Sequence, residues 1–184
     1  QDYRFVVVPK VVHPWFDIVV DGARAASEVL AEQTGDTFEV EYLAPQTANV
    51  VVQNNIVERA IATNPTGIMI DMLDAAANEP VLQEAKDRGI AVVIFDNWGA
   101  NTNLNAPVIG NDLCKMAQDA AHEVVRLMGG KGEVALIKGV PTSPTHATRA
   151  RCGRETIDTY PDVTIVAEGV DNENIETAQQ QAAG

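Results

Sequence analysis

Seven short apolar runs recur along the chain, and most of them are continuous rather than alternating with polar residues. A continuous apolar run is typical of a parallel strand covered on both faces, whereas a strand with one solvated face alternates. This feature restricts the possible folds strongly, because parallel neighbours must be joined by crossover segments. The runs occupy residues 3–8, 37–43, 66–72, 89–96, 105–110, 132–139 and 163–169.

Helical periodicity fills the intervals between most of these runs. After Pro14, apolar residues recur in steps of three and four along residues 16–30, and Gly35 follows as a stop signal. A second periodic segment begins at Asp112 and is closed by Gly129. Strand and helix therefore alternate along the whole chain, which predicts an open, doubly wound α/β fold with parallel strands and right-handed crossovers.

The composition argues against several classes of partner and chemistry. The 184 residues are 46% hydrophobic and 21% charged, as in a globular chain that buries a core. A formal charge of −13 without a run of Lys or Arg argues against nucleic acid and against an anionic membrane surface as partner. No apolar stretch reaches the roughly 18 to 20 residues of a spanning helix. The two cysteines lack Cys-x-x-Cys spacing, which argues against a zinc site and thioredoxin chemistry.

Polar and aromatic residues follow the predicted strands at their carboxyl ends, where open parallel sheets bind ligands. The set carries both charge signs and aromatic rings. It suits a hydroxyl-rich ligand, because carboxylates and amides pair with hydroxyls, an Arg fork clamps an oxygen, and flat rings cover the C–H faces of a sugar. The candidates are Lys10, His13, Trp15, Phe16, Asp71, Asp96, Asn97, Trp98, Asn111, Asp112, Thr145, His146, Arg149 and Arg151.

Several candidates also have a simpler structural interpretation. Trp15 and Phe16 suit packing in the core, as a hydrophobic staple for their own helix, as well as a wall for a ligand. Asp96 suits a helix cap or a turn. Lys10 suits an exposed strand end, and His146 suits a loop residue rather than a catalyst.

Four short motifs stand in order along the chain. They are His-Pro-Trp-Phe at residues 13–16, Gly-Ile-Ala-Val followed by a strand ending in Asp at residues 89–97, Val-Ile-Gly-Asn-Asp at residues 108–112, and an Arg-containing helix ahead of Tyr-Pro-Asp-Val at residues 160–163. Each motif alone is weak, but their order and intervals make nearly all of the chain resemble the ribose-type periplasmic sugar-binding proteins of ABC uptake systems.

The resemblance implies two Rossmann-like lobes of the type I periplasmic binding protein fold. The first lobe is expected at residues 1–110 and a partial second lobe at residues 111–184. The second lobe would contain only the strands at 132–139 and 163–169, whereas a doubly wound lobe usually has about four to six. We therefore expect the chain to be truncated on its carboxyl side, with further second-lobe strands beyond Gly184.

The resemblance also assigns roles to site residues. Phe16 and its neighbour Trp15 would stack on the sugar ring, and Asp96 would accept two hydroxyl groups. An arginine of the Thr-Arg-Ala-Arg segment would clamp an oxygen from the second lobe. Counting back from the fourth motif selects Arg149, and counting forward from the preceding strand favours Arg151, so both remain candidates.

The implied function is that of a solute receptor which binds a small sugar, polyol or sugar-like ligand between its lobes for an ABC permease. It would be a periplasmic, monomeric, non-catalytic protein without a cofactor, with its signal peptide removed. Departures from the family at His13, Asn97 and Gly110 indicate a ligand other than simply ribose. The alternatives are a receptor for the furanose-derived quorum signal, favoured by Lys10 in Val-Pro-Lys, and a small-molecule enzyme on a flavodoxin-like scaffold. The enzyme is disfavoured because no GxGxxG follows the first strand.

Cys114 and Cys152 are candidates for a disulfide. Each is expected in the first turns of a second-lobe helix, one after Gly-Asn-Asp and the other after Thr-Arg-Ala-Arg. An oxidising periplasm permits the bond. The alternative is two small buried thiols.

Overall fold

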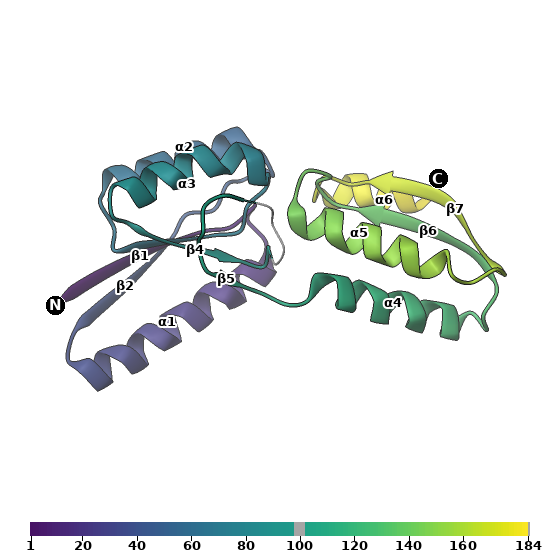
Figure 1. The fold of residues 1–184 in the computed structure, drawn as a ribbon, viewed down its shortest axis with the longest axis horizontal. Helices are drawn as coiled ribbons and strands as arrows, with labels where there is room; N and C mark the ends of the chain where they lie inside the picture. Colours follow the sequence, from purple (N-terminus) through teal and green to yellow (C-terminus); the bar gives the residue numbers. More distant parts are fainter. Residues whose placement is uncertain (98–101, 184) are drawn as a thin grey trace. The chain divides into compact units, whose positions relative to one another are not determined.

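The computed structural model describes residues 1–97 and 102–183 (Figure 1). Strands and helices alternate through them, except where two strands follow one another at residues 91–95 and 108–109, and every strand pair is parallel. This confirms the predicted α/β class. The described residues separate into two compact units, one formed by residues 1–97 and 102–109 and the other by residues 110–183.

The first unit is a five-stranded parallel sheet covered by three helices. Figure 1 shows α1 on one face of the sheet and α2 and α3 on the other. The strand order is β2-β1-β3-β4-β5, so the chain winds outward from β1 in both directions. The elements are β1 Asp2–Val8, α1 Pro14–Thr34, β2 Thr37–Tyr42, α2 Val50–Ala62, β3 Gly67–Ile70, α3 Ala75–Asp87, β4 Ala91–Phe95 and β5 Val108–Ile109.

The core of the first unit lies where the continuous apolar runs predicted it. Val6, Val7 and Val8 of β1 are all buried, as expected for a central strand covered on both faces. On the α1 face, side chains of β1, α1 and β4 form one cluster, to which Phe16 and Phe95 belong. Tyr42 packs against this cluster, and burial together with the negative charge of Asp17 raises the pKa of its hydroxyl.

The last strand of this sheet is much shorter than predicted. The apolar run at residues 105–110 contains only the two-residue strand β5. Asn105 adopts a left-handed backbone with φ 47°, and Pro107 has no N–H to donate to a ladder. Pro107 instead accepts from the N–H of Ile94 at 2.9 Å, where pairing with β4 begins.

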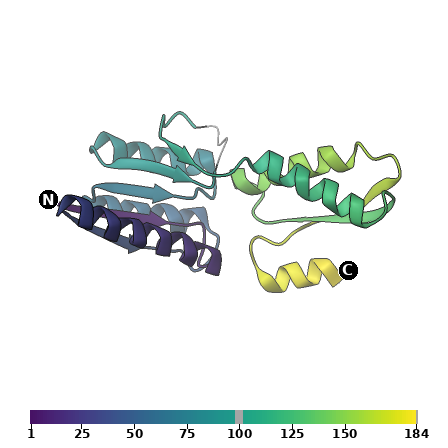
Figure 2. The same cartoon turned by 90° about the horizontal axis from the view of Figure 1, so that it is seen from below.

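The second unit contains two parallel strands and three helices. Figure 2 shows α6 on the opposite side of the strands from α4 and α5. Its core joins Ala121 and Val125 of α4, Ile157 of α5 and Val163 of β7. The elements are α4 Leu113–Leu127, β6 Gly132–Lys138, α5 Pro144–Ile157, β7 Val163–Val170 and α6 Ile175–Ala183.

Helix α5 begins earlier than the sequence prediction. Pro144 occupies one of its first positions, where proline is favoured because its missing N–H has no helical partner anyway. Cys152 consequently lies in the third turn of α5, not in its first turns. His146 lies in the first turn and is buried, so the interpretation as a loop residue is wrong.

A disulfide joins Cys114 of α4 to Cys152 of α5, with the two Cα atoms 5.3 Å apart. It closes a loop with a sequence separation of 38 residues and ties together two helices that pack on each other.

We expect the double variant Cys114→Ser/Cys152→Ser to lose about 3 to 4 kcal/mol of unfolding free energy, because the bond restricts the unfolded chain. Urea unfolding of the oxidised parent and of the variant measures the difference. The reduced parent is the matched control, and its unfolding free energy should be close to that of the variant. Two thiols titrating in denaturant without reductant would show that the parent carries no such bond.

Candidate functional site

The carboxyl ends of β1, β3 and β4 are neighbours, because these strands are consecutive in the sheet order. The residues that follow them therefore meet at one edge. Nζ of Lys10 lies 3.2 Å from Oδ2 of Asp71 and 3.9 Å from Oδ2 of Asp96. These three residues are called the Lys10 cluster below. The chain order reverses between β1 and β3, and open α/β sheets bind ligands at such a switch point.

The Lys10 cluster is shielded from solvent except at one carboxylate. The exposed fraction of the side chain is 3% for Lys10, 0% for Asp71 and 14% for Asp96. The interpretation of Lys10 as an exposed strand-end residue is therefore wrong. One positive and two negative side chains give the cluster a formal charge of −1. Asp96 is the member whose side chain is partly exposed.

The backbone fixes the orientation of Asp96. Its φ of 61° lies in the left-handed region, which a residue other than glycine adopts at a cost of about 1 kcal/mol or more. The N–H of Asp96 donates to the carbonyl of Ile109 at 2.8 Å. The adjacent Asn97 is fully buried, and its Oδ1 accepts from the N–H of Met72. Asn97 therefore links the segment after β4 to the segment after β3.

Aromatic rings border the cluster at the start of α1. Phe16 is buried in the core against Phe95, and its ring centroid lies 5.9 Å from Nζ of Lys10. Trp15 is 45% exposed and meets Phe16 edge to face at 5.0 Å. Nδ1 of the exposed His13 accepts from the N–H of Trp15 and caps α1. Phe16 therefore packs in the core, whereas the ring of Trp15 is partly exposed to solvent.

The other described candidates belong to the second unit. Asn111 and Arg149 are exposed, and Asp112 caps α4 by accepting from the N–H of Lys115. Arg151 is exposed and pairs with Glu155 one turn along α5, an arrangement that contributes little to stability. The contributions of these residues to ligand binding stay predictions. Trp98 lies outside the described residues.

The buried His146 and the partly buried Glu173 of the same unit form a separate contact. His146 in the first turn of α5 places Nε2 3.2 Å from Oε1 of Glu173, which precedes α6. Thr145, beside His146, is fully buried. These contacts connect α5 to the segment after β7.

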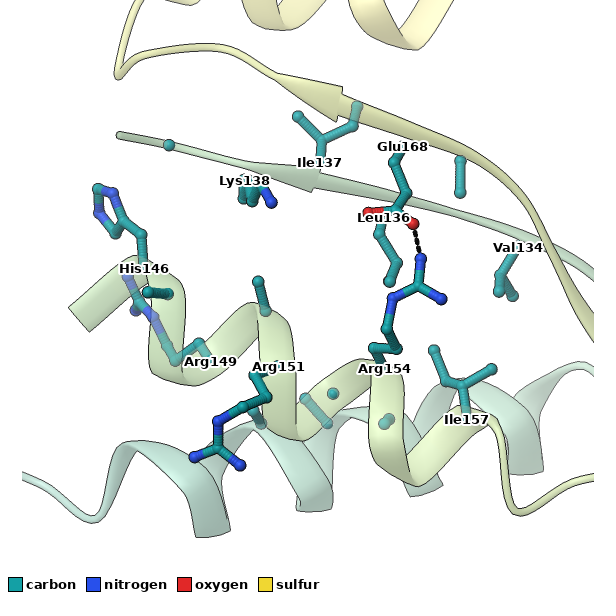
Figure 3. Close-up of a pocket in the computed structure, with 18 of the residues that line it drawn as sticks. Val134, Leu136, Ile137, Lys138, His146, Arg149, Arg151, Arg154, Ile157 and Glu168 are labelled. Atoms are coloured by element: carbon teal, nitrogen blue, oxygen red, sulfur yellow. Dashed lines mark ion pairs between the residues drawn. The ribbon is translucent and has the colours of Figure 1, made fainter. Parts of the chain in front are cut away.

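The second unit also contains a hollow of about 800 Å³ bounded by α4, α5 and β6 (Figure 3). Its lining is mainly apolar, with Leu136, Ile137 and Ile157 labelled in the close-up, and an ion pair joins Arg154 to Glu168 across it. Hydroxyl-rich ligands need convergent polar groups. The Lys10 cluster, with an ammonium and two carboxylates close together, meets this requirement better than the hollow.

Gln53 and Asn78 were not among the residues predicted from the sequence. Both are fully buried: Gln53 donates to the carbonyl of Asp71, and Asn78 donates to Gln53 and accepts from the N–H of Asp74. The available signal was position: Gln53 lies four residues before the buried Val57, on the same face of α2. A polar residue on an apolar helical face needs hydrogen-bond partners inside the protein.

Within the described residues, no group of three or more His, Cys, Asp or Glu side chains is arranged to hold a metal ion. The described helices include none that is both long enough and apolar enough to cross a membrane.

Comparison of the sequence with known proteins places it among solute-binding proteins. The profile of the periplasmic binding protein domain matches residues 5–184. The chain is 24% identical over 167 residues to the D-apiose import binding protein of Actinobacillus succinogenes, covering 91% of the chain and 52% of that protein. It is 27% identical over 159 residues to the D-ribose/D-allose-binding protein of Pseudomonas aeruginosa, covering 83% and 49%. The chain thus spans about half the length of these curated relatives.

Solved structures share the fold. A glucose-galactose binding protein from Geobacillus stearothermophilus superposes with a TM-score of 0.84 at 25% identity, over 100% of this chain and 63% of that one. An ABC transporter solute-binding protein from Burkholderia graminis, in complex with D-arabinose, gives 0.82 at 21% identity, over 98% and 60%. These likenesses agree with the type I periplasmic binding protein fold predicted above, represented here over part of its length.

Proposed function

Because the chain belongs to the family of periplasmic binding protein domains, we propose that it serves as a solute receptor and that its first unit binds a small neutral sugar or polyol. The observation that carries the proposal is the Lys10 cluster at the switch point of the sheet. Asp96 offers carboxylate oxygens to ligand hydroxyl groups, while Lys10 and Asp71 are buried behind it.

The charge of the cluster supports a neutral ligand. The ammonium of Lys10 already lies near two carboxylates, so a sugar acid would bring a further negative charge to a site whose formal charge is −1. Like charges that share a buried site repel each other. A polyhydroxyl compound instead donates hydrogen bonds to Asp96, and these are charge-assisted.

The relatives support a sugar of small size. Their names state D-apiose and D-ribose/D-allose, and one neighbouring structure contains D-arabinose. We propose the same class of ligand here, delivered in the periplasm to an ABC permease by a monomeric receptor. The names of these relatives describe binding proteins, one of them an import binding protein, which supports a non-catalytic role. Asn111, Arg149 and Arg151 of the second unit stay candidate ligand-binding residues, as the resemblance implies.

Titration calorimetry with D-apiose, D-ribose, D-allose and D-arabinose tests the proposal, together with an aldonic acid and the furanose-derived quorum signal. We expect sub-millimolar binding of at least one neutral sugar and much weaker binding of the acid. Mass spectrometry of ligand carried through purification identifies a natural occupant. Failure of every neutral sugar, with no sugar found in the purified protein, would refute the proposal.

Trp15 provides a second, optical test. We expect a bound sugar to change the tryptophan fluorescence, because the half-exposed Trp15 ring borders the cluster through Phe16. Trp15→Leu should weaken binding by about three- to tenfold through loss of ring contact. Trp15→Phe keeps an aromatic ring and is the matched control, and it should lose less sugar affinity than Trp15→Leu. Parent-like affinity of Trp15→Leu would remove this ring from the site.

A further inference from the structure

We propose that Gln53 is a positioning residue for the Lys10 cluster: its buried side chain fixes the main chain at the ends of β1 and β3. Gln53 does not touch the cluster's charged groups in any of its four side-chain hydrogen bonds, so its effect would act through the backbone. The part of this inference that concerns sugar affinity rests on the function proposed above, whereas the part that concerns loop order does not.

The side chain of Gln53 uses its full hydrogen-bonding capacity. Nε2 donates to the carbonyl of Pro9 at 3.0 Å and to that of Asp71 at 2.8 Å. Oε1 accepts from the N–H of Leu73 at 3.2 Å and from Nδ2 of Asn78 at 3.0 Å. A glutamine amide has two donors and two acceptor sites, and all four are occupied. The residue is fully buried, so water cannot replace these partners.

The bonded carbonyls belong to the segments that carry the cluster. Pro9 directly precedes Lys10, and the second carbonyl is that of Asp71 itself. One rigid amide group therefore bridges the main chain of the two segments whose side chains form the 3.2 Å ion pair. At the end of the ladder between β1 and β3, the N–H of Asp71 donates to the carbonyl of Val8 at 3.1 Å. The hydrogen bonds of Gln53 join the same two segments beyond the ends of the strands.

A second amide supports the first. Asn78 of α3 is fully buried, donates to Oε1 of Gln53 and accepts from the N–H of Asp74 at 3.1 Å. On the other side, Asn97 accepts from the N–H of Met72. The segment of residues 71–74 is thus held by three side-chain amides from α2, α3 and the end of β4. Such a fully satisfied network fixes a single arrangement of the backbone it contacts.

The test compares Gln53→Met, which keeps the length of the side chain but none of its hydrogen bonds, with Val57→Ala as a matched control. Val57 lies one turn further along α2, is equally buried, and contributes packing only. Three quantities are measured for each variant: the unfolding midpoint, the affinity for D-ribose and D-apiose by calorimetry, and hydrogen exchange of the backbone amides at residues 71–74.

We expect Gln53→Met to weaken sugar binding by about tenfold or more and to accelerate exchange at residues 71–74, because misplacement of bonding groups by about 1 Å is costly. Val57→Ala should lower the unfolding midpoint comparably while changing affinity less than about twofold. Asn78→Ala removes one bond to Gln53 and should give an intermediate loss. It also takes the place of Gln53→Met if that variant does not fold.

Parent-like affinity in Gln53→Met or Asn78→Ala, or a loss no greater than that in Val57→Ala, would overturn the proposal. If the parent binds none of the neutral sugars named above and carries no sugar through purification, the proposed function fails, and hydrogen exchange then decides the role of Gln53 alone. Unchanged exchange at residues 71–74 in the variant would show that Gln53 does not position this segment. Faster exchange confined to these residues would support it.

Discussion

Replacing Asp96 with alanine should lower the affinity for the bound sugar by about 100-fold or more, because two charge-assisted hydrogen bonds of about 1.5 to 3 kcal/mol each are lost. Asp96 is the one member of the Lys10 cluster with a partly exposed carboxylate. Calorimetry with a sugar that binds the parent measures the loss. Circular dichroism melting should show that the variant remains folded.

Because the backbone at Asp96 is left-handed, Asp96→Ala needs a control that separates loss of stability from loss of sugar affinity. Alanine adopts a φ of 61° less readily than aspartate or asparagine, so Asp96→Ala also loses about 1 kcal/mol of stability. Asn105→Ala has the same backbone problem at φ 47°, but Asn105 lies before the amino end of β5, whereas Asp96 follows the carboxyl end of β4. It should lose stability without losing affinity. A normal melting curve together with unchanged sugar affinity in Asp96→Ala would remove Asp96 from the site.

The sequence predicts the fold well where one local signal decides it. The continuous apolar run at residues 3–8 corresponds to the buried strand β1, and Gly35 ends α1 with a left-handed φ of 74°. The errors lie where a second local signal was given too little weight. Pro107 shortens the last strand of the first sheet, and Pro144 starts α5 before the predicted position.

The surroundings of Lys10 could not be predicted from its neighbours in the sequence. A lysine just after a strand is usually exposed, and the segment Val-Pro-Lys contains no counter-ion. Its partners come from segments about 60 and 86 residues further along, and they meet only because β3 and β4 lie beside β1 in that order. Gln53 escaped prediction for a related reason, since its partners are main-chain groups of two other segments.

The burial of Lys10 leads to the largest expected effect on stability. Asp71 is fully buried and its carboxylate lies 3.2 Å from the ammonium of Lys10. Removing one partner of a buried ion pair takes an opposite charge from the group that stays buried away from water, which costs roughly 3 to 5 kcal/mol. We therefore expect Lys10→Met, which retains the aliphatic stem, to destabilise the first unit by that amount and to abolish sugar binding.

The double variant Lys10→Met/Asp71→Asn separates the missing charge from the missing packing. With both charges removed, much of the lost stability should return, so urea unfolding of the parent, both single variants and the double variant should give a coupling of about 2 kcal/mol or more. Sugar affinity should stay low in the double variant, because Asp96 no longer has the ammonium beside it. If Lys10→Met is as stable as the parent, Asp71 does not depend on Lys10 for compensation. The charge argument for a neutral ligand would then lose its basis, and the aldonic acid should be titrated against the variant as well as the parent.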